Sequence, residues 1–321
     1  MNHNDLNKEA RSVINDIEEA ERLGRRIPLH KMNALEARKS FYEMRNALSP
    51  NPPEVEAFFD FKIPVTNGLI KARYYRGKNK DRSNILPVTI FFHGGGWVIG
   101  DLDTHDVVCR QISNEGNFDV VSVNYRKAPE YKFPFAINDS IEAINFVVKN
   151  SINLPIDTNK IALCGDSAGG NIATVCCINA KINFFPKIIF QALIYPSTHL
   201  GSNYNSRKKY DGLILSDPLM KWFQSKYLEK EKINDWRVAP ILYKDLSKLN
   251  PSLIIVAGCD PLKDEGIAYG EALKKAGNIT ETKIFHGQIH GFLTMGARIS
   301  DANKLIKLVC KKIDESFYSN F

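Results

Sequence analysis

The chain has 321 residues, of which 44% are hydrophobic and 25% charged, as expected of a globular protein long enough for a deep core. Its formal net charge of +7 is spread over short runs, with no basic stripe interleaved with aromatic residues, so we expect no nucleic-acid partner. The first residues are polar and no apolar run reaches the length of about 18 residues that a transmembrane helix needs. We therefore expect neither a signal peptide nor stable membrane insertion.

The six cysteines point to a reduced protein. They show no CxxC spacing and no histidine partners at zinc-finger distances, and most lie in apolar runs, where a free thiol behaves as a small buried hydrophobe. We therefore predict a cytoplasmic, reduced protein whose cysteines bind no metal. These cysteines are Cys109, Cys164, Cys176, Cys177, Cys259 and Cys310.

The N-terminal part reads as two helices. Apolar residues recur every three or four positions over residues 5–23, and residues 33–46 form a second helical stretch. The proline cluster at residues 49–53 marks the clearest boundary in the chain. Because two helices alone bury too little surface, we expect residues 1–54 to pack on a neighbouring domain.

Beyond this boundary the pattern changes to strands and then to a strand–helix alternation. Two strands flank the turn Thr66-Asn67-Gly68, where Asn-Gly favours a hairpin. The alternation that follows is typical of an α/β fold with a mostly parallel sheet between layers of helices. The predicted strands are 56–65, 69–75, 85–92, 118–124, 160–164, 187–193, 253–257 and 281–286, and the predicted helices are 105–115, 135–150, 171–180, 263–276 and 300–316.

One segment interrupts the alternation. Residues 197–245 are polar but rich in Tyr and Trp, with one predicted helix near Asp217–Leu228. An insertion of this size between two core strands is either a lid or a disordered excursion, and the aromatic residues favour a packed lid. We therefore expect residues 197–245 to form a packed lid inserted between two parts of a core, residues 55–196 and 246–321.

A Gly-x-Ser-x-Gly pentapeptide stands at the centre of the chain. Gly165-Asp166-Ser167-Ala168-Gly169 lies between the buried strand and the helix that starts at Asn171. Such a turn forces its central residue into a strained conformation, which neighbouring glycines relieve, and holds the hydroxyl at a helix N-terminus. Ser167 is our candidate nucleophile, although an idle serine in a tight turn is the alternative for this motif alone.

A glycine-rich loop follows the strand that ends at Phe92. In His93-Gly94-Gly95-Gly96-Trp97 the glycines let backbone N–H groups approach a ligand, and the loop lies at the carboxyl end of its strand. The amides of Gly95, Gly96 and Ala168 are therefore candidates for an oxyanion hole. A merely flexible loop is the alternative for this motif taken by itself.

A serine nucleophile needs a base, and the base needs an orienting acid. Asp260 and His290 follow Ser167 in the order that this fold requires, and each comes just after a predicted strand. Asp264 and Glu265 begin a helix, where acidic residues are expected for the dipole, and His286 lies inside its strand. His93 more naturally shapes its loop by hydrogen bonding, and the histidines at positions 3, 30, 105 and 199 have no matching context.

These motifs together resemble the hormone-sensitive-lipase group of α/β-hydrolase esterases. The resemblance covers residues 85–292, with Lys127 standing where the family usually has leucine, at a position compatible with the surface. It implies Ser167, Asp260 and His290 as the catalytic triad and Gly95, Gly96 and Ala168 as the oxyanion hole, under a cap of the N-terminal helices and the insertion. The motifs are His93–Trp97, Tyr125–Glu130, Gly165–Gly170, Asp260–Gly266 and His290–Phe292.

The resemblance implies a serine carboxylesterase for short- to medium-chain acyl esters, working through an acyl-enzyme, and we expect such an enzyme to need neither a metal nor an organic cofactor. Trp97, His93 and Asp166 are expected to line the substrate pocket. An amidase or thioesterase with the same triad is the nearest alternative, and a non-catalytic small-molecule receptor on the same fold is a more distant one. The sequence leaves the oligomeric state open, with a homodimer as one alternative.

Overall fold

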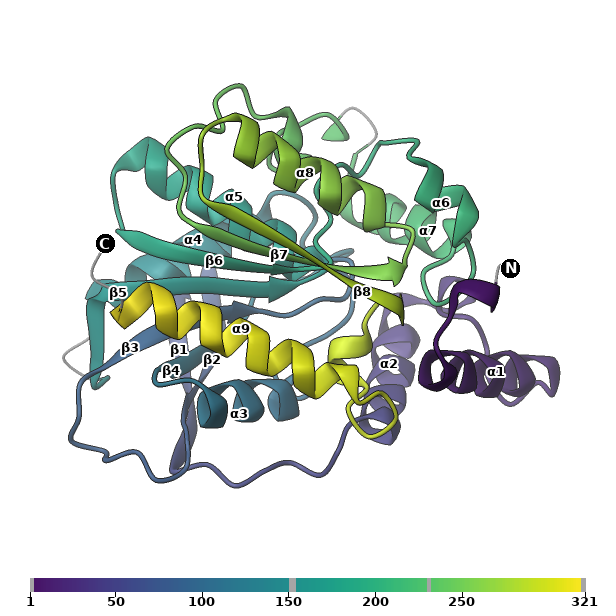
Figure 1. Cartoon of the computed structure of the whole chain (residues 1–321), viewed down its shortest axis with the longest axis horizontal. Helices are drawn as coiled ribbons and strands as arrows, with labels where there is room; N and C mark the ends of the chain where they lie inside the picture. Colours follow the sequence, from purple (N-terminus) through teal and green to yellow (C-terminus); the bar gives the residue numbers. More distant parts are fainter. Residues whose placement is uncertain (1–2, 150–153, 230–231, 319–321) are drawn as a thin grey trace.

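A computed structural model describes residues 3–149, 154–229 and 232–318, and its centre is a sheet of eight strands (Figure 1). The strand order is β1-β2-β4-β3-β5-β6-β7-β8. β2 pairs antiparallel with both β1 and β4, and every other pairing is parallel. The strands are β1 (Ala57–Val65), β2 (Gly68–Arg76), β3 (Leu86–Phe92), β4 (Asp119–Asn124), β5 (Ile156–Asp166), β6 (Ile188–Ile194), β7 (Ser252–Cys259) and β8 (Thr280–Ile289).

Helices cover both faces of this sheet. α3 and α9 pack against one face and α4, α5 and α8 against the other (Figure 1). Short 3₁₀ helices span His3–Asp5, Leu29–Lys31, Pro240–Leu242 and Phe292–Thr294. The α-helices are α1 (Lys8–Arg22), α2 (Ala34–Leu48), α3 (Asp106–Glu115), α4 (Phe135–Lys149), α5 (Ala168–Asn183), α6 (Asn205–Lys209), α7 (Asp217–Tyr227), α8 (Lys263–Lys275) and α9 (Asp301–Tyr318).

The side chains of strand β3 enter the hydrophobic cores on both faces of the sheet. Because successive side chains of a strand point to opposite faces, a strand buried on both sides reads as a continuous apolar run. Ile90 and Phe92 belong to the core under α4, α5 and α8, whereas Phe91 belongs to the core under α3 and α9. The same alternation in β5 puts Leu163 in the first core and Cys164 in the second.

The N-terminal helices and the segment with α6 and α7 lie at the end of the sheet where the parallel strands terminate (Figure 1). Helix α2 begins with a capping box, in which Asn33 accepts a hydrogen bond from the Glu36 amide and Glu36 accepts one from the Asn33 amide. Ser216 caps α7 in a similar way, and Pro218 stands in its first turn. Local capping therefore sets where these helices start, and their apolar faces decide what they cover.

The α/β-hydrolase fold is confirmed, with differences in detail from the predicted elements. The serine helix begins at Ala168, directly after Ser167, rather than at Asn171. β5 begins at Ile156, four residues before the predicted strand, because a polar stretch pairs with the start of β3. α6 was not predicted, since five polar residues show no period. The helix predicted over 135–150 is described over Phe135–Lys149, and residue 150 lies outside the described part.

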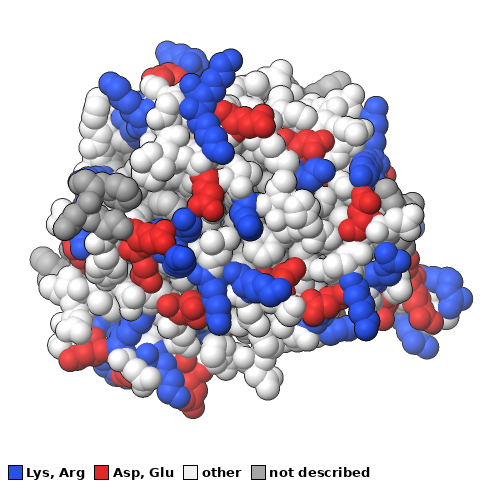
Figure 2. Space-filling model, viewed as in Figure 1, with Lys and Arg blue, Asp and Glu red and all other residues white. Residues whose placement is uncertain are grey.

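Basic and acidic side chains are interspersed over the face drawn in Figure 2. All six cysteines are buried and unpaired. Within the described ranges, none of the helices combines the length and the apolar character needed to cross a membrane.

Candidate active site

Ser167 lies at the sharp turn between β5 and α5. Its backbone has φ +57° and ψ −117°, a strained conformation for a residue with a side chain. The flanking glycines make the turn possible, because a Cβ on Gly165 would lie 2.3 Å from the Gly169 carbonyl oxygen. A Cβ on Gly169 would lie 1.9 Å from the Phe92 carbonyl oxygen. The turn thus packs directly against the end of β3, where the glycine loop begins.

Three side chains from three strand ends form one hydrogen-bonded row. His290 Nε2 lies 2.9 Å from Ser167 Oγ, and His290 Nδ1 lies 2.7 Å from Asp260 Oδ2. Asp260 is fully buried, and its other oxygen accepts a hydrogen bond of 2.8 Å from the Leu262 amide. The carboxylate is therefore held on both sides, and it orients the imidazole with its second nitrogen facing the serine.

The predicted oxyanion donors lie around the same serine. Gly95 (φ +125°) and Gly96 (φ +57°) adopt left-handed backbone conformations that favour glycine. Two amides, those of Val98 and Ile99, donate to the Gly95 carbonyl at 3.1 and 2.9 Å and fold the loop back. Gly95, Gly96 and Ala168 line one cavity with Ser167 and His290. Ala168 is the first residue of α5, where an amide has no acceptor within its helix.

Asp166 connects the serine turn to the glycine loop. Its Oδ1 accepts a hydrogen bond of 2.7 Å from the Gly94 amide and lies 3.2 Å from His105 Nε2. Burial would raise the pKa of Asp166, but His105, the Gly94 amide and Arg45 together lower it, so the carboxylate is charged. Asp166 lines the cavity as predicted. The role of His105 was missed, because its approach to Asp166 depends on how α3 packs.

Trp97 and His93 stand at the two ends of the glycine loop and pack on different aromatic rings. Trp97 lines the cavity as predicted, and its ring stacks on Tyr227 with 4.5 Å between centroids. The prediction that His93 lines the cavity is wrong: its ring is fully buried and stacks on Tyr125 with centroids 4.3 Å apart. Burial lowers the pKa of His93 well below its usual value, so the ring is neutral. Its Nδ1 lies 2.9 Å from the Gly94 carbonyl oxygen, as expected of a residue that shapes the loop.

Comparison with known proteins agrees with this geometry. Residues 89–294 match the model of a family described as having the alpha/beta hydrolase fold. The chain is 36% identical over 262 residues to the carboxylic ester hydrolase LipN of Mycobacterium tuberculosis, covering 77% of this chain and 68% of LipN. It belongs to the hormone-sensitive-lipase-like esterases of the α/β-hydrolase superfamily.

Two further relatives match this hydrolase over nearly its whole length. The ethyl acetate hydrolase of Pseudomonas putida is 29% identical over 317 residues, which cover 97% of this chain and 99% of that enzyme. An ester hydrolase from the metagenome of Lake Arreo, solved with a bipyridine phosphonate derivative, superposes with a TM-score of 0.93 at 33% identity. That match covers 98% of this chain and 100% of the solved chain.

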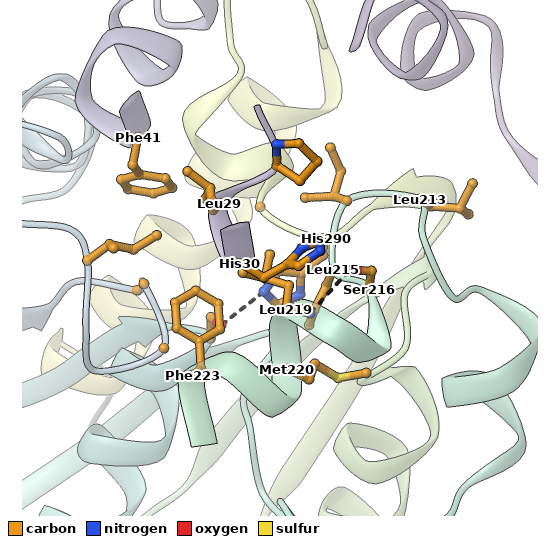
Figure 3. Close-up of a pocket in the computed structure, with 18 of the residues that line it drawn as sticks. Leu29, His30, Phe41, Leu213, Leu215, Ser216, Leu219, Met220, Phe223 and His290 are labelled. Atoms are coloured by element: carbon orange, nitrogen blue, oxygen red, sulfur yellow. Dashed lines mark hydrogen bonds between the residues drawn. The ribbon is translucent and has the colours of Figure 1, made fainter. Parts of the chain in front are cut away.

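The cavity of this hydrolase has a volume of about 390 Å³ and is bounded mainly by apolar side chains. One wall comes from the N-terminal segment and the opposite wall from the segment around α7, with His290 between them (Figure 3). Such a shape suits a small ligand with an apolar portion. The labelled apolar residues are Leu29 and Phe41 on the first wall and Leu213, Leu215, Leu219, Met220 and Phe223 on the second.

Proposed function

We propose that this protein is a serine carboxylesterase that hydrolyses short- to medium-chain acyl esters at Ser167. The observation that carries the proposal is the continuous row from Asp260 through His290 to Ser167, which ends in an apolar cavity. A nucleophile, its base and the group that orients the base have the mutual geometry that acyl transfer requires. The esterases named among the relatives support the same reaction class.

In the proposed acylation step, His290 Nε2 takes the proton of Ser167 as Oγ attacks the ester carbonyl carbon. Asp260 stabilises the imidazolium that forms, and the amides of Gly95, Gly96 and Ala168 bind the oxyanion. Collapse of the tetrahedral intermediate breaks the carbon–oxygen bond to the alcohol, which receives the proton from His290. A water molecule, deprotonated by His290, then attacks the acyl-enzyme, and the acid leaves as Ser167 regains its proton.

We also propose that residues 1–54 and 197–245 together form the cap of this site. Both segments supply residues to the cavity wall, including Phe41 from α2 and Phe223 from α7. Phe223 lies against the glycine loop, because a Cβ on Gly96 would be 2.4 Å from its ring. The cap therefore bounds the space for the acyl chain, and the cavity volume is in the range for small ligands rather than long lipids.

A cytoplasmic location is proposed from the thiols. Six buried, unpaired cysteines are typical of a compartment that keeps thiols reduced. The expected partner is a small ester, with no nucleic acid, and a homodimer stays an open prediction. Fractionation of the native host cell, with detection of the protein in each fraction, tests the location.

The activity is tested with purified protein on p-nitrophenyl esters from acetate to palmitate, with Ser167→Ala measured in parallel. We expect a peak at short chains that the variant abolishes while its circular dichroism and thermal unfolding stay unchanged. Full residual activity of the variant would remove Ser167 from the mechanism. Activity on thioesters or amides but not on esters would favour the alternative reaction with the same triad, and binding without turnover would favour the receptor.

A further inference from the structure

Helix α2 carries an arginine on its buried face. Its buried residues, Ala34, Ala37, Phe41 and Arg45, recur at spacings of three and four, so Arg45 occupies a position where the pattern calls for an apolar side chain. Arg45 is only 6% exposed and lines the cavity that contains Ser167 and His290. A charged side chain at such a position is costly unless it is paired, and therefore indicates a function.

The charge of Arg45 has no carboxylate partner among the residues that the structure describes. Its Nη1 donates a long hydrogen bond of 3.3 Å to the Gly291 carbonyl, its Nε is buried without a partner, and its guanidinium lies 4.6 Å from the centre of the Phe41 ring. Arg76, which is also deeply buried, is paired in contrast: its guanidinium donates hydrogen bonds to both carboxylate oxygens of Asp119.

Nearby charges act on Arg45 only from a distance. Burial lowers its pKa, Asp166 and Tyr195 oppose this change, and Arg26 adds to it, yet an arginine keeps its proton at any physiological pH. Arg26 also borders the cavity, but Glu21 neutralises it at 2.6 Å. Asp166 is engaged by the Gly94 amide and His105. Of the two arginines that line the cavity in the described part of the chain, Arg45 is thus the one without a directly bonded carboxylate.

This guanidinium lies beside the catalytic base. Gly291 follows His290 directly, and a Cβ on Gly291 would lie 2.8 Å from Arg45 Nη2, so the guanidinium packs against the backbone of that residue. Any ester bound at Ser167 thus shares its cavity with a planar, buried cation. Guanidinium groups bind carboxylates through charge-assisted, often paired hydrogen bonds.

We propose that Arg45 is a specificity-determining residue that binds a carboxylate on the substrate, so that the preferred esters are monoanionic. This inference rests on the proposed function and deepens it: the substrate class is an ester with a free carboxylate in its acyl or its alcohol part. The substrate carboxylate would pair with the Arg45 guanidinium, which has no carboxylate partner in the described protein, and would offset the free-energy cost of burying that charge.

The experiment compares isosteric ester pairs at pH 7, where the carboxylate is ionised. Monoethyl succinate is matched with ethyl levulinate for a charge in the acyl part, and acetoxyacetate with acetoxyacetone for a charge in the alcohol part. The readout is the ratio of kcat/KM within each pair, which a purely structural role of Arg45 would not move. We expect the wild-type protein to prefer the anionic member of at least one pair by about tenfold or more.

Three variants distinguish binding of the substrate carboxylate by Arg45 from a general effect of positive charge. Arg45→Met should lower that ratio by about ten- to a hundredfold, and Arg45→Lys should retain part of it. Lys39→Met, which removes an exposed cation from the same helix and away from the cavity, should leave the ratio within about threefold. No wild-type preference in either pair, or a ratio that Arg45→Met leaves unchanged, would overturn the inference.

A binding measurement keeps this test independent of turnover. Titration calorimetry with Ser167→Ala compares the affinities for monoethyl succinate and ethyl levulinate, with and without Arg45→Met in the same chain. Tighter binding of the anion that depends on Arg45 supports the inference even if no ester is hydrolysed, in which case only the proposed function fails. Hydrolysis of neutral esters without any preference for anions rejects the inference and leaves the proposed function standing.

Discussion

The Asp166 carboxylate accepts a hydrogen bond of 2.7 Å from the Gly94 amide, and this contact joins the serine turn to the glycine loop. Two segments far apart in the chain, one with the proposed nucleophile and one with two proposed oxyanion donors, are thereby held at a constant separation. The same Oδ1 lies 3.2 Å from His105 Nε2, so the carboxylate has partners on two elements. Asp166 is therefore a positioning residue in the proposed mechanism.

Asp166→Ala should lower kcat by about a hundredfold, with a smaller change in KM, because the loop amides would no longer be aimed at the oxyanion. The measurement is steady-state hydrolysis of p-nitrophenyl acetate, with His105→Gln as a second variant that weakens only one of the two contacts. A KM that rises with kcat unchanged would place Asp166 in substrate binding instead.

Asp260→Asn should lower kcat by about a thousandfold or more while preserving the fold. The side-chain amide is isosteric, but its NH₂ group facing His290 Nδ1 would favour the wrong tautomer, and it would not stabilise the imidazolium. Single-turnover kinetics measure the acylation rate directly, and thermal unfolding serves as the control for folding. Less than a tenfold loss would exclude Asp260 as the orienting acid.

Trp97→Ala should shift the acyl-chain preference toward longer esters, because removal of the indole enlarges the cavity that it lines. The stack on Tyr227 would be lost as well, so the free energy of unfolding should fall by about 3–5 kcal/mol. The measurement is kcat/KM across the p-nitrophenyl series, with Trp97→Phe as the matched variant that keeps an aromatic ring. An unchanged preference would assign Trp97 to the core alone.

Lys127→Leu should raise the free energy of unfolding by about 1–3 kcal/mol at pH 7. Burial lowers the pKa of Lys127 to about 8, and its Nζ donates to Asn124 Oδ1 at 2.8 Å. The folded protein thus carries a penalty for the charged amine below pH 8, and this penalty disappears as the pH rises toward the value of an unfolded lysine.

The gain from Lys127→Leu should accordingly shrink between pH 8 and about 10.5. Urea unfolding at several pH values measures this gain. The control is Lys149→Leu, which replaces an exposed lysine of α4. If the gain in the free energy of unfolding did not depend on pH, the pKa of Lys127 in the folded protein would not be lowered as stated.

Much of the fold and of the candidate triad was predictable because local chemistry decides both. Glycines on either side of Ser167 are required by the turn itself, and Asp260 and His290 each follow an apolar strand, so their common edge follows from parallel pairing. The capping residues Asn33 and Ser216 likewise mark helix starts within a few residues of themselves. These features depend on steric and hydrogen-bonding rules that act over short stretches of chain.

Other contacts were decided by the tertiary structure alone, because they join elements whose relative positions do not follow from the local sequence. The approach of His105 to Asp166, the burial of His93 under its loop and the entry of Arg45 into the cavity all depend on how separate elements pack. The spacing of α2 placed Arg45 on the apolar face, yet only packing of that face over His290 made it part of the site. The candidate triad follows from the order of the strands, whereas the proposed substrate preference follows from what the proposed cap brings over them.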